Sequence, residues 1–81
     1  MTDLLAKRQL LQNAGYVYNF DREVYVNRKA KKVFSLEFVE DNSEDDLRKR
    51  IGEDTGAQVW RFYFNAEPSK AVQEELEEIL G

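Results

Sequence analysis

Residues 16–40 read YVYNFDREVYVNRKAKKVFSLEFVE, with aromatic or β-branched side chains at every second position over much of the stretch. A period of two residues is typical of β-strands that bury one face. Asp21-Arg22 and residues 27–31 interrupt the alternation. Strands joined by short turns are favoured as antiparallel neighbours. The stretch therefore predicts a three-stranded antiparallel meander over Tyr16–Phe20, Glu23–Asn27 and Lys32–Glu40.

Helical periodicity flanks this meander on both sides. Residues 3–14 place Leu4, Leu10 and Leu11 on one helical face, and Gly15 suits the left-handed residue that ends such a helix. Ser43 precedes the acidic run Glu44-Asp45-Asp46, which is typical of a capped helix start, and this short helix is expected to stop before Thr55-Gly56. A last helix follows Pro68, with an apolar stripe at Val72, Leu76, Ile79 and Leu80.

The remaining periodic stretch, Gln58–Asn65, predicts a fourth strand. The predicted fold is therefore α+β in the order αβββαβα, forming a single domain over residues 1–81. Three helices pack with one mixed four-stranded sheet, made of the antiparallel meander and a fourth strand that follows a helical crossover and runs parallel to the third. The neighbour of the fourth strand in the sheet stays open.

Alternation along the strands also predicts which sheet face lies under the helices. The expected core residues are Tyr16, Tyr18, Phe20, Val24, Val26, Phe34, Leu36, Phe38, Trp60, Phe62 and Phe64. The opposite face would then lie in solvent and present Tyr25, Arg61 and Tyr63, which are residue types enriched at protein-binding hot spots.

The composition excludes several kinds of site. The chain has no Cys and no His, which removes disulfides, imidazole bases and most transition-metal centres. We expect no cofactor, no metal site, no catalytic residue and no small-molecule ligand. No run of 18 apolar residues is present, so we expect a cytoplasmic protein without membrane contact.

Charge is unevenly distributed along the sequence. Residues 1–32 hold seven Lys/Arg against three Asp/Glu, whereas residues 33–81 hold five against thirteen. The turn at 28–32 gathers Arg28, Lys29, Lys31 and Lys32, which could contact phosphates, with Tyr25 and Tyr63 as stacking platforms. Weak nucleic-acid binding is therefore one alternative function.

Two topological resemblances bear on function. A helix, three strands and a helix is similar to the double-stranded-RNA-binding domain, but that family needs cations at its second helix, where Ser43-Glu44-Asp45-Asp46 stands here. With the fourth strand added, the order resembles restriction-endonuclease-like nucleases. Asp21 and Glu37 stand near that family's metal-binding acids, and Val39 replaces its lysine. A divalent-metal-dependent nuclease is the lower-ranked alternative.

The leading hypothesis is a small non-enzymatic protein-binding module: a regulator, an inhibitor or an accessory subunit. Its candidate contact residues are Tyr25, Arg61 and Tyr63 on the sheet, with Glu74 and Glu78 on the acidic last helix. The expected partner is another protein or a second copy of the chain, because sheet edges in so small a fold favour strand pairing.

Overall fold

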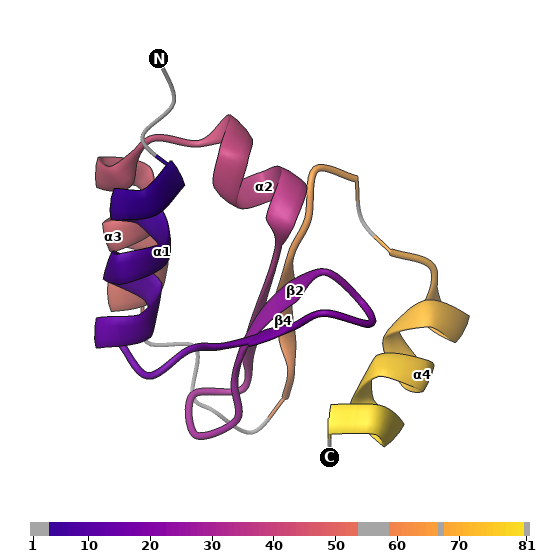
Figure 1. Ribbon diagram of the computed structural model, residues 1–81. Coiled ribbons are helices and arrows are strands. Elements are labelled where there is room, and N and C mark those ends of the chain that lie inside the picture. The colour runs from indigo at the N-terminus through magenta and orange to yellow at the C-terminus, as the bar shows by residue number, and fades with distance from the viewer. Residues whose placement is uncertain (1–3, 54–58, 67, 81) are drawn as a thin grey trace.

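The structure is a computed structural model that describes residues 4–53, 59–66 and 68–80 (Figure 1). Its elements are α1 (Leu4–Asn13), β1 (Val17–Asn19), β2 (Val24–Asn27), β3 (Lys32–Ser35), α2 (Leu36–Asp41), α3 (Glu44–Gly52), β4 (Arg61–Tyr63) and α4 (Lys70–Leu80).

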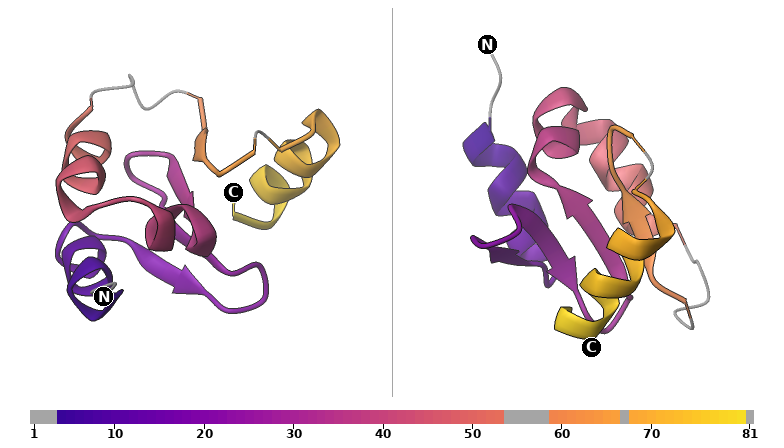
Figure 2. Two further views of the ribbon diagram at one scale, coloured as in Figure 1. Left: turned by 90° about the horizontal axis from the view of Figure 1, so that it is seen from above. Right: turned by 90° about the vertical axis from the view of Figure 1, so that its right-hand side faces the viewer.

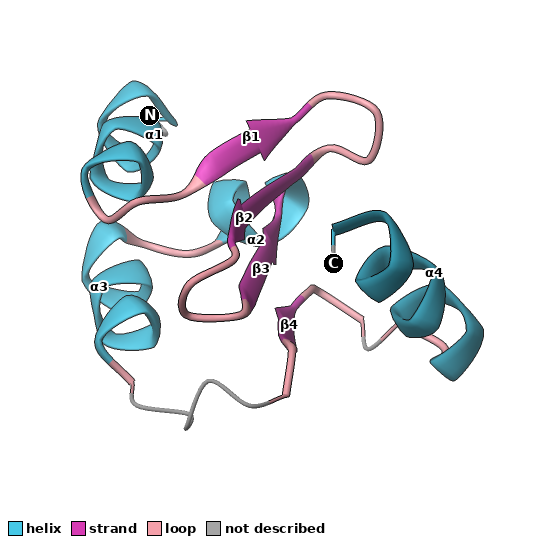
Figure 3. Ribbon diagram, turned by 90° about the horizontal axis from the view of Figure 1, so that it is seen from below, coloured by secondary structure: helices cyan, strands magenta, loops and turns pink. Residues whose placement is uncertain are grey.

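The strands form one mixed sheet in the order β1-β2-β3-β4 (Figure 3). β1, β2 and β3 are antiparallel neighbours, and β4 pairs in parallel with β3. The predicted α+β fold, the meander and the parallel fourth strand are confirmed. The structure also identifies the neighbour that the sequence left open, since β4 lies beside β3 after a crossover through α2 and α3.

The third strand is shorter than predicted, and the extension to Glu40 is wrong. β3 ends at Ser35, whose Oγ accepts a hydrogen bond from the backbone N–H of Phe38 at 3.1 Å and caps α2. The apolar residues of this segment also suit a helix, because Leu36 and Val39 lie three residues apart and therefore on one helical face. Leu36 is partly buried and Val39 is fully buried. The fold therefore has a fourth helix that the predicted order lacked.

The strand register determines which side chains share a face of the sheet. Tyr18 pairs with Tyr25, Tyr25 with Phe34, and Phe34 with Tyr63, so these four rings form one row on the same face. Val17, Val26, Val33 and Phe62 form the corresponding row on the other face. The predicted single core face is therefore wrong, because it combined Val24, Val26 and Phe62 with Phe34, which points to the opposite side.

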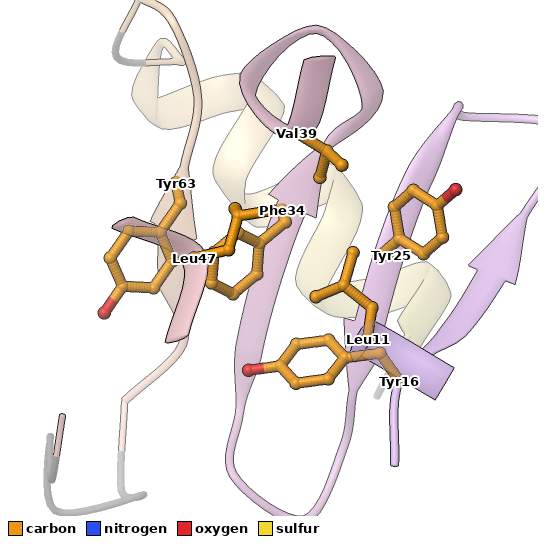
Figure 4. Close-up of a cluster of buried hydrophobic side chains, with 7 residues drawn as sticks. All are labelled: Leu11, Tyr16, Tyr25, Phe34, Val39, Leu47 and Tyr63. Atoms are coloured by element: carbon orange, nitrogen blue, oxygen red, sulfur yellow. The ribbon is translucent and has the colours of Figure 1, made fainter. Parts of the chain in front are cut away.

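Helices cover both faces of the sheet. α1, α2 and α3 lie on one side of the sheet and α4 lies alone on the other (Figures 1 and 2), and the first three helices pack against the aromatic row. The cluster under the first three helices, here called the main core, contains Leu11, Tyr16, Tyr25, Phe34, Val39, Leu47 and Tyr63 (Figure 4). The cluster under α4, here called the second core, contains Val24, Val26, Val33 and Leu76.

Local signals at the helix ends are confirmed. Gly15 has a φ of +94°, its N–H donates to the carbonyl of Gln12, and the N–H of Tyr16 donates to the carbonyl of Leu11. This pair of hydrogen bonds forms a Schellman motif around Gly15, the left-handed residue predicted to end the helix. Ser43 likewise caps α3, because its Oγ accepts a hydrogen bond from the N–H of Asp46.

Several predicted bounds shift by a few residues. The first three strands begin or end inside the predicted ranges, and the fourth covers only Arg61–Tyr63 of Gln58–Asn65. Asp3 and Gln58 lie outside the described residues, and α3 ends at Gly52, before Thr55-Gly56 as predicted. Within the described ranges, none of the helices has both the length and the apolarity needed to span a bilayer.

Stability is expected to fall as the pH rises above about 10, where the tyrosines of an unfolded chain ionise. Burial raises the pKa of Tyr16, and nearby Tyr63 raises it further; burial also raises the pKa of Tyr25 and Tyr63. The folded state therefore keeps protons that the unfolded state releases. Urea unfolding at a series of pH values from 7 to 11 measures this loss.

Tyr16→Phe is the matched variant for this alkaline effect. The Tyr16 hydroxyl is buried and has no hydrogen-bond partner in the described part of the chain, so its removal is expected to leave stability at pH 7 unchanged or slightly raised. Above pH 10 the variant should lose stability less steeply than the parent, by at most about 1.4 kcal/mol per pH unit. An unchanged alkaline slope would contradict the role given to Tyr16.

Candidate binding surface

The two tyrosines proposed as contact residues lie in the main core. Tyr25 is 1% exposed and Tyr63 is 8% exposed. The Tyr63 ring stacks on Phe34 with centroids 4.6 Å apart, and its hydroxyl donates to Oε2 of Glu53 at 3.2 Å. The prediction that they form an open binding face is wrong, because α1, α2 and α3 cover that side of the sheet.

The other proposed contact residues are exposed. Arg61 lies on β4, at one edge of the sheet. Glu74 and Glu78 lie one helical turn apart on α4 and therefore share a face of it. Among the described residues, no ion pair joins Arg61 to either glutamate. The exposed acidic face of α4 is therefore a candidate binding surface, and Arg61 on β4 is not part of it.

The four cations of the basic turn differ in their exposure to solvent. Arg28 and Lys29 are exposed and Lys31 is partly exposed, whereas Lys32 is only 2% exposed. Lys32 Nζ donates to the backbone carbonyls of Arg50, Ile51 and Glu53 at the C-terminal end of α3. A cation in this position compensates the partial negative charge of a helix end. The assignment of Lys32 to phosphate contact is therefore wrong, and Tyr25 and Tyr63 are too buried to stack on bases.

Of the two acids in the nuclease alternative, Asp21 lies before the second strand as the resemblance implied, but Glu37 does not lie on the third strand. Glu37 lies in the first turn of α2, because β3 ends at Ser35, and Asp21 lies in the turn between β1 and β2. Across residues 4–53, 59–66 and 68–80, no three acidic side chains are arranged to hold a metal ion. The geometry that the resemblance implied, with Glu37 on the third strand, is not present.

A pocket lies at the end of the sheet where the parallel strands β3 and β4 finish. Its volume is about 300 Å³. Three segments far apart in the sequence line this open pocket: residues 22–23 before β2, residues 35–37 at the start of α2, and residues 64–66 after β4. The crevice beyond the carboxyl ends of parallel strands is where α/β sheets commonly place ligands. We call this cavity the end pocket.

One backbone and one side-chain hydrogen bond position residues around the end pocket. Glu23 has a φ of +54°, a left-handed conformation uncommon for a residue with a side chain. Its carbonyl accepts a hydrogen bond from the N–H of Leu36 at 3.0 Å, which ties the β1–β2 turn to the start of α2. On the opposite wall, Nδ2 of Asn65 donates to Oδ2 of Asp41 at 2.8 Å. The pocket is thus bounded by positioned backbone.

The charges around the end pocket are unequal. Arg22 is the cation of its lining, and its guanidinium forms an ion pair with Glu75 of α4 at 2.5 Å. Glu23 and Glu37 also line the pocket, and neither forms an ion pair with another described residue. With Arg22 compensated by Glu75, the pocket keeps two carboxylates beside the apolar side chains Leu36 and Phe64.

The end pocket is not evident from the sequence, because residues 35–37 also fit the alternation of a strand. Two signals were available: Ser35 followed by an acid is a helix-start pattern, and Asp21-Arg22-Glu23 marked the turn that forms one wall. The third wall, at Phe64 and Asn65, depends on the pairing of β4 with β3, which no local pattern contains.

Comparison with known proteins identifies no relative. The chain matches no protein-family model, no curated protein and no solved structure.

Proposed function

We propose that this protein is a small non-enzymatic protein-binding module, acting as a regulator, an inhibitor or an accessory subunit, and that its partner presents a basic surface. The observation that carries the proposal is the acidic surface of α4. Glu74, Glu75 and Glu78 are exposed on this helix, and Glu75 reaches the rim of the end pocket through its ion pair with Arg22. We call the face of α4 that carries Glu74, Glu75 and Glu78 the acidic surface.

The charge of the whole chain supports a basic partner. The net charge is −4, and the excess of acids falls in residues 33–81, which include α4. Complementary charge raises association rates and excludes partners of the same sign. Nucleic acid is the less favoured partner, because its phosphates would meet these carboxylates and because Lys32 caps α3 instead of facing solvent.

Self-association is one form of this proposal. Arg28 and Lys29 supply an exposed basic turn that could contact the acidic surface of a second copy. Sedimentation equilibrium measures this directly: a mass that rises with protein concentration and falls back with added salt would support it. A monomer mass at every concentration would leave a different protein as the partner.

The cytoplasmic location stays a prediction.

Selection from a library of random 12-residue peptides displayed on phage tests the partner class. We expect enrichment of peptides rich in Lys and Arg, because exposed carboxylates dominate the acidic surface. For a selected peptide, Glu74→Gln with Glu78→Gln should weaken binding about tenfold, since removing two exposed charges of α4 amounts to about 1.4 kcal/mol. Isothermal titration calorimetry at low salt gives these affinities.

A matched variant removes the same charge elsewhere. Glu44→Gln with Asp45→Asn neutralises two acids in the first turn of α3, on the other side of the sheet from α4. This variant should bind a selected peptide within about twofold of the parent protein, because distant surface charges act weakly. Equal losses in both double variants, or enrichment of acidic peptides, would contradict the proposal.

A further inference from the structure

We infer that the end pocket binds an arginine side chain of the partner protein. This inference rests on the proposed function and adds the residue type that the surface selects. The supporting observations are the size of the pocket, its two uncompensated carboxylates and its apolar wall.

The size of the pocket favours a single side chain. Its volume of about 300 Å³ stands at the lower limit of the 300–1,000 Å³ that is usual for pockets that hold drug-sized ligands and cofactors. A flexible side chain of a larger partner needs only a short, open-ended cavity, because the rest of the partner stays on the surface. The adjoining acidic surface on α4, linked by the Arg22–Glu75 ion pair, provides that area.

The charges favour a cation as the occupant. Glu23 and Glu37 come from separate walls of the pocket, and no ion pair with another described residue neutralises either of them. The resident cation Arg22 is already compensated by Glu75. An incoming anion would face two carboxylates, whereas an incoming cation would compensate them. The pocket therefore favours a positively charged occupant over a negatively charged one.

The remaining walls favour arginine over lysine. Phe64 and Leu36 line the pocket beside the carboxylates. A guanidinium group stacks on aromatic rings and, being planar with several donors, can hydrogen-bond two acceptors on different sides. The ammonium of lysine is more strongly hydrated and loses more on entering a cavity with apolar walls.

An NMR titration with two peptides tests this inference. The first probe is the acetylated and amidated heptapeptide Gly-Lys-Gly-Arg-Gly-Lys-Gly, and the second carries citrulline, the uncharged isostere, in place of arginine. We expect the arginine peptide to shift the amide signals of Glu37, Phe64 and Asn65 and to bind about tenfold more tightly than the citrulline peptide. Equal affinity for the two peptides would overturn the inference.

Matched variants separate the pocket from the acidic surface. Glu37→Gln should reduce the tenfold preference for arginine to about twofold or less, because one of two carboxylates is lost. Glu40→Gln is the control, since Glu40 is exposed on the same helix but does not line the pocket. A preference that survives in Glu37→Gln, or that Glu40→Gln removes equally, would overturn the inference.

The two proposals fail in different ways. The double variant Glu74→Gln with Glu78→Gln should weaken both peptides equally and leave the preference for arginine intact, because its charges lie outside the pocket lining. If both peptides bind equally well and lose affinity in that variant, the acidic surface stands and the arginine pocket does not. If neither basic peptide binds, the proposed function itself is contradicted.

Discussion

Replacing Phe34 with alanine is expected to lower the free energy of unfolding by about 3–5 kcal/mol, which approaches the whole stability of a small domain. Phe34 is 0% exposed at the centre of the main core. Its ring meets Tyr16 edge-on at 5.3 Å and stacks on Tyr63 at 4.6 Å. Truncation leaves a cavity that these rigid rings cannot fill. Urea unfolding, followed by far-ultraviolet circular dichroism, measures the loss.

Two further variants keep this prediction testable if Phe34→Ala does not fold. Phe34→Leu retains most of the volume and should cost about 1–1.5 kcal/mol. Phe20→Ala makes the same truncation at a ring that is 80% exposed, and should change stability by less than about 1 kcal/mol. A larger loss from Phe62→Ala than from Phe34→Ala would place the main core on the other face of the sheet.

Replacing Lys32 with methionine is expected to lower the free energy of unfolding by about 2–3 kcal/mol, because hydrogen bonds from a charged donor are lost within the protein. Lys32 Nζ donates to the carbonyls of Arg50 at 2.9 Å and Ile51 at 3.0 Å, and also to that of Glu53. Methionine fills a similar volume but has no donor. The last carbonyls of α3 would then be left without this partner. Urea unfolding of the variant gives the loss.

Lys29→Met is the control for Lys32→Met. Lys29 lies in the same turn and is exposed, so its replacement should change stability by less than about 0.5 kcal/mol. Hydrogen exchange adds a local measurement, since amides near the end of α3 should lose protection in Lys32→Met alone. Similar effects from both variants would mean that Lys32 does not cap the helix.

Helix ends that depend on residues close together in the chain can be predicted from the sequence. Gly15 ends α1 because a residue without Cβ adopts a positive φ at little cost, and Ser43 starts α3 because its hydroxyl accepts a hydrogen bond from a nearby N–H. Both interactions span only a few residues. The pattern at residues 36–40 is ambiguous, because Leu36 and Phe38 fit strand alternation whereas Leu36 and Val39 fit helical spacing.

Features that depend on strand register could not be predicted. Tyr25 is in the main core because it pairs with Tyr18 and Phe34, and a shift of one residue would have placed it on the opposite face. Lys32 was predicted to face solvent because four cations share its turn, yet its neighbour across space is the end of α3. The sequence of the turn contains no information on where that helix ends.

Sequence patterns are sufficient for the α+β class, the meander, the parallel fourth strand after a crossover, and the acidic character of α4. Each of these follows from periodicity, turn residues and charge over short spans. Three features are visible only in the folded chain: both sheet faces are covered, Tyr25, Tyr63 and Lys32 are buried, and Glu23, Glu37 and Phe64 line one pocket. These features depend on contacts between residues far apart in the chain, whose relative placement is set by register and helix packing.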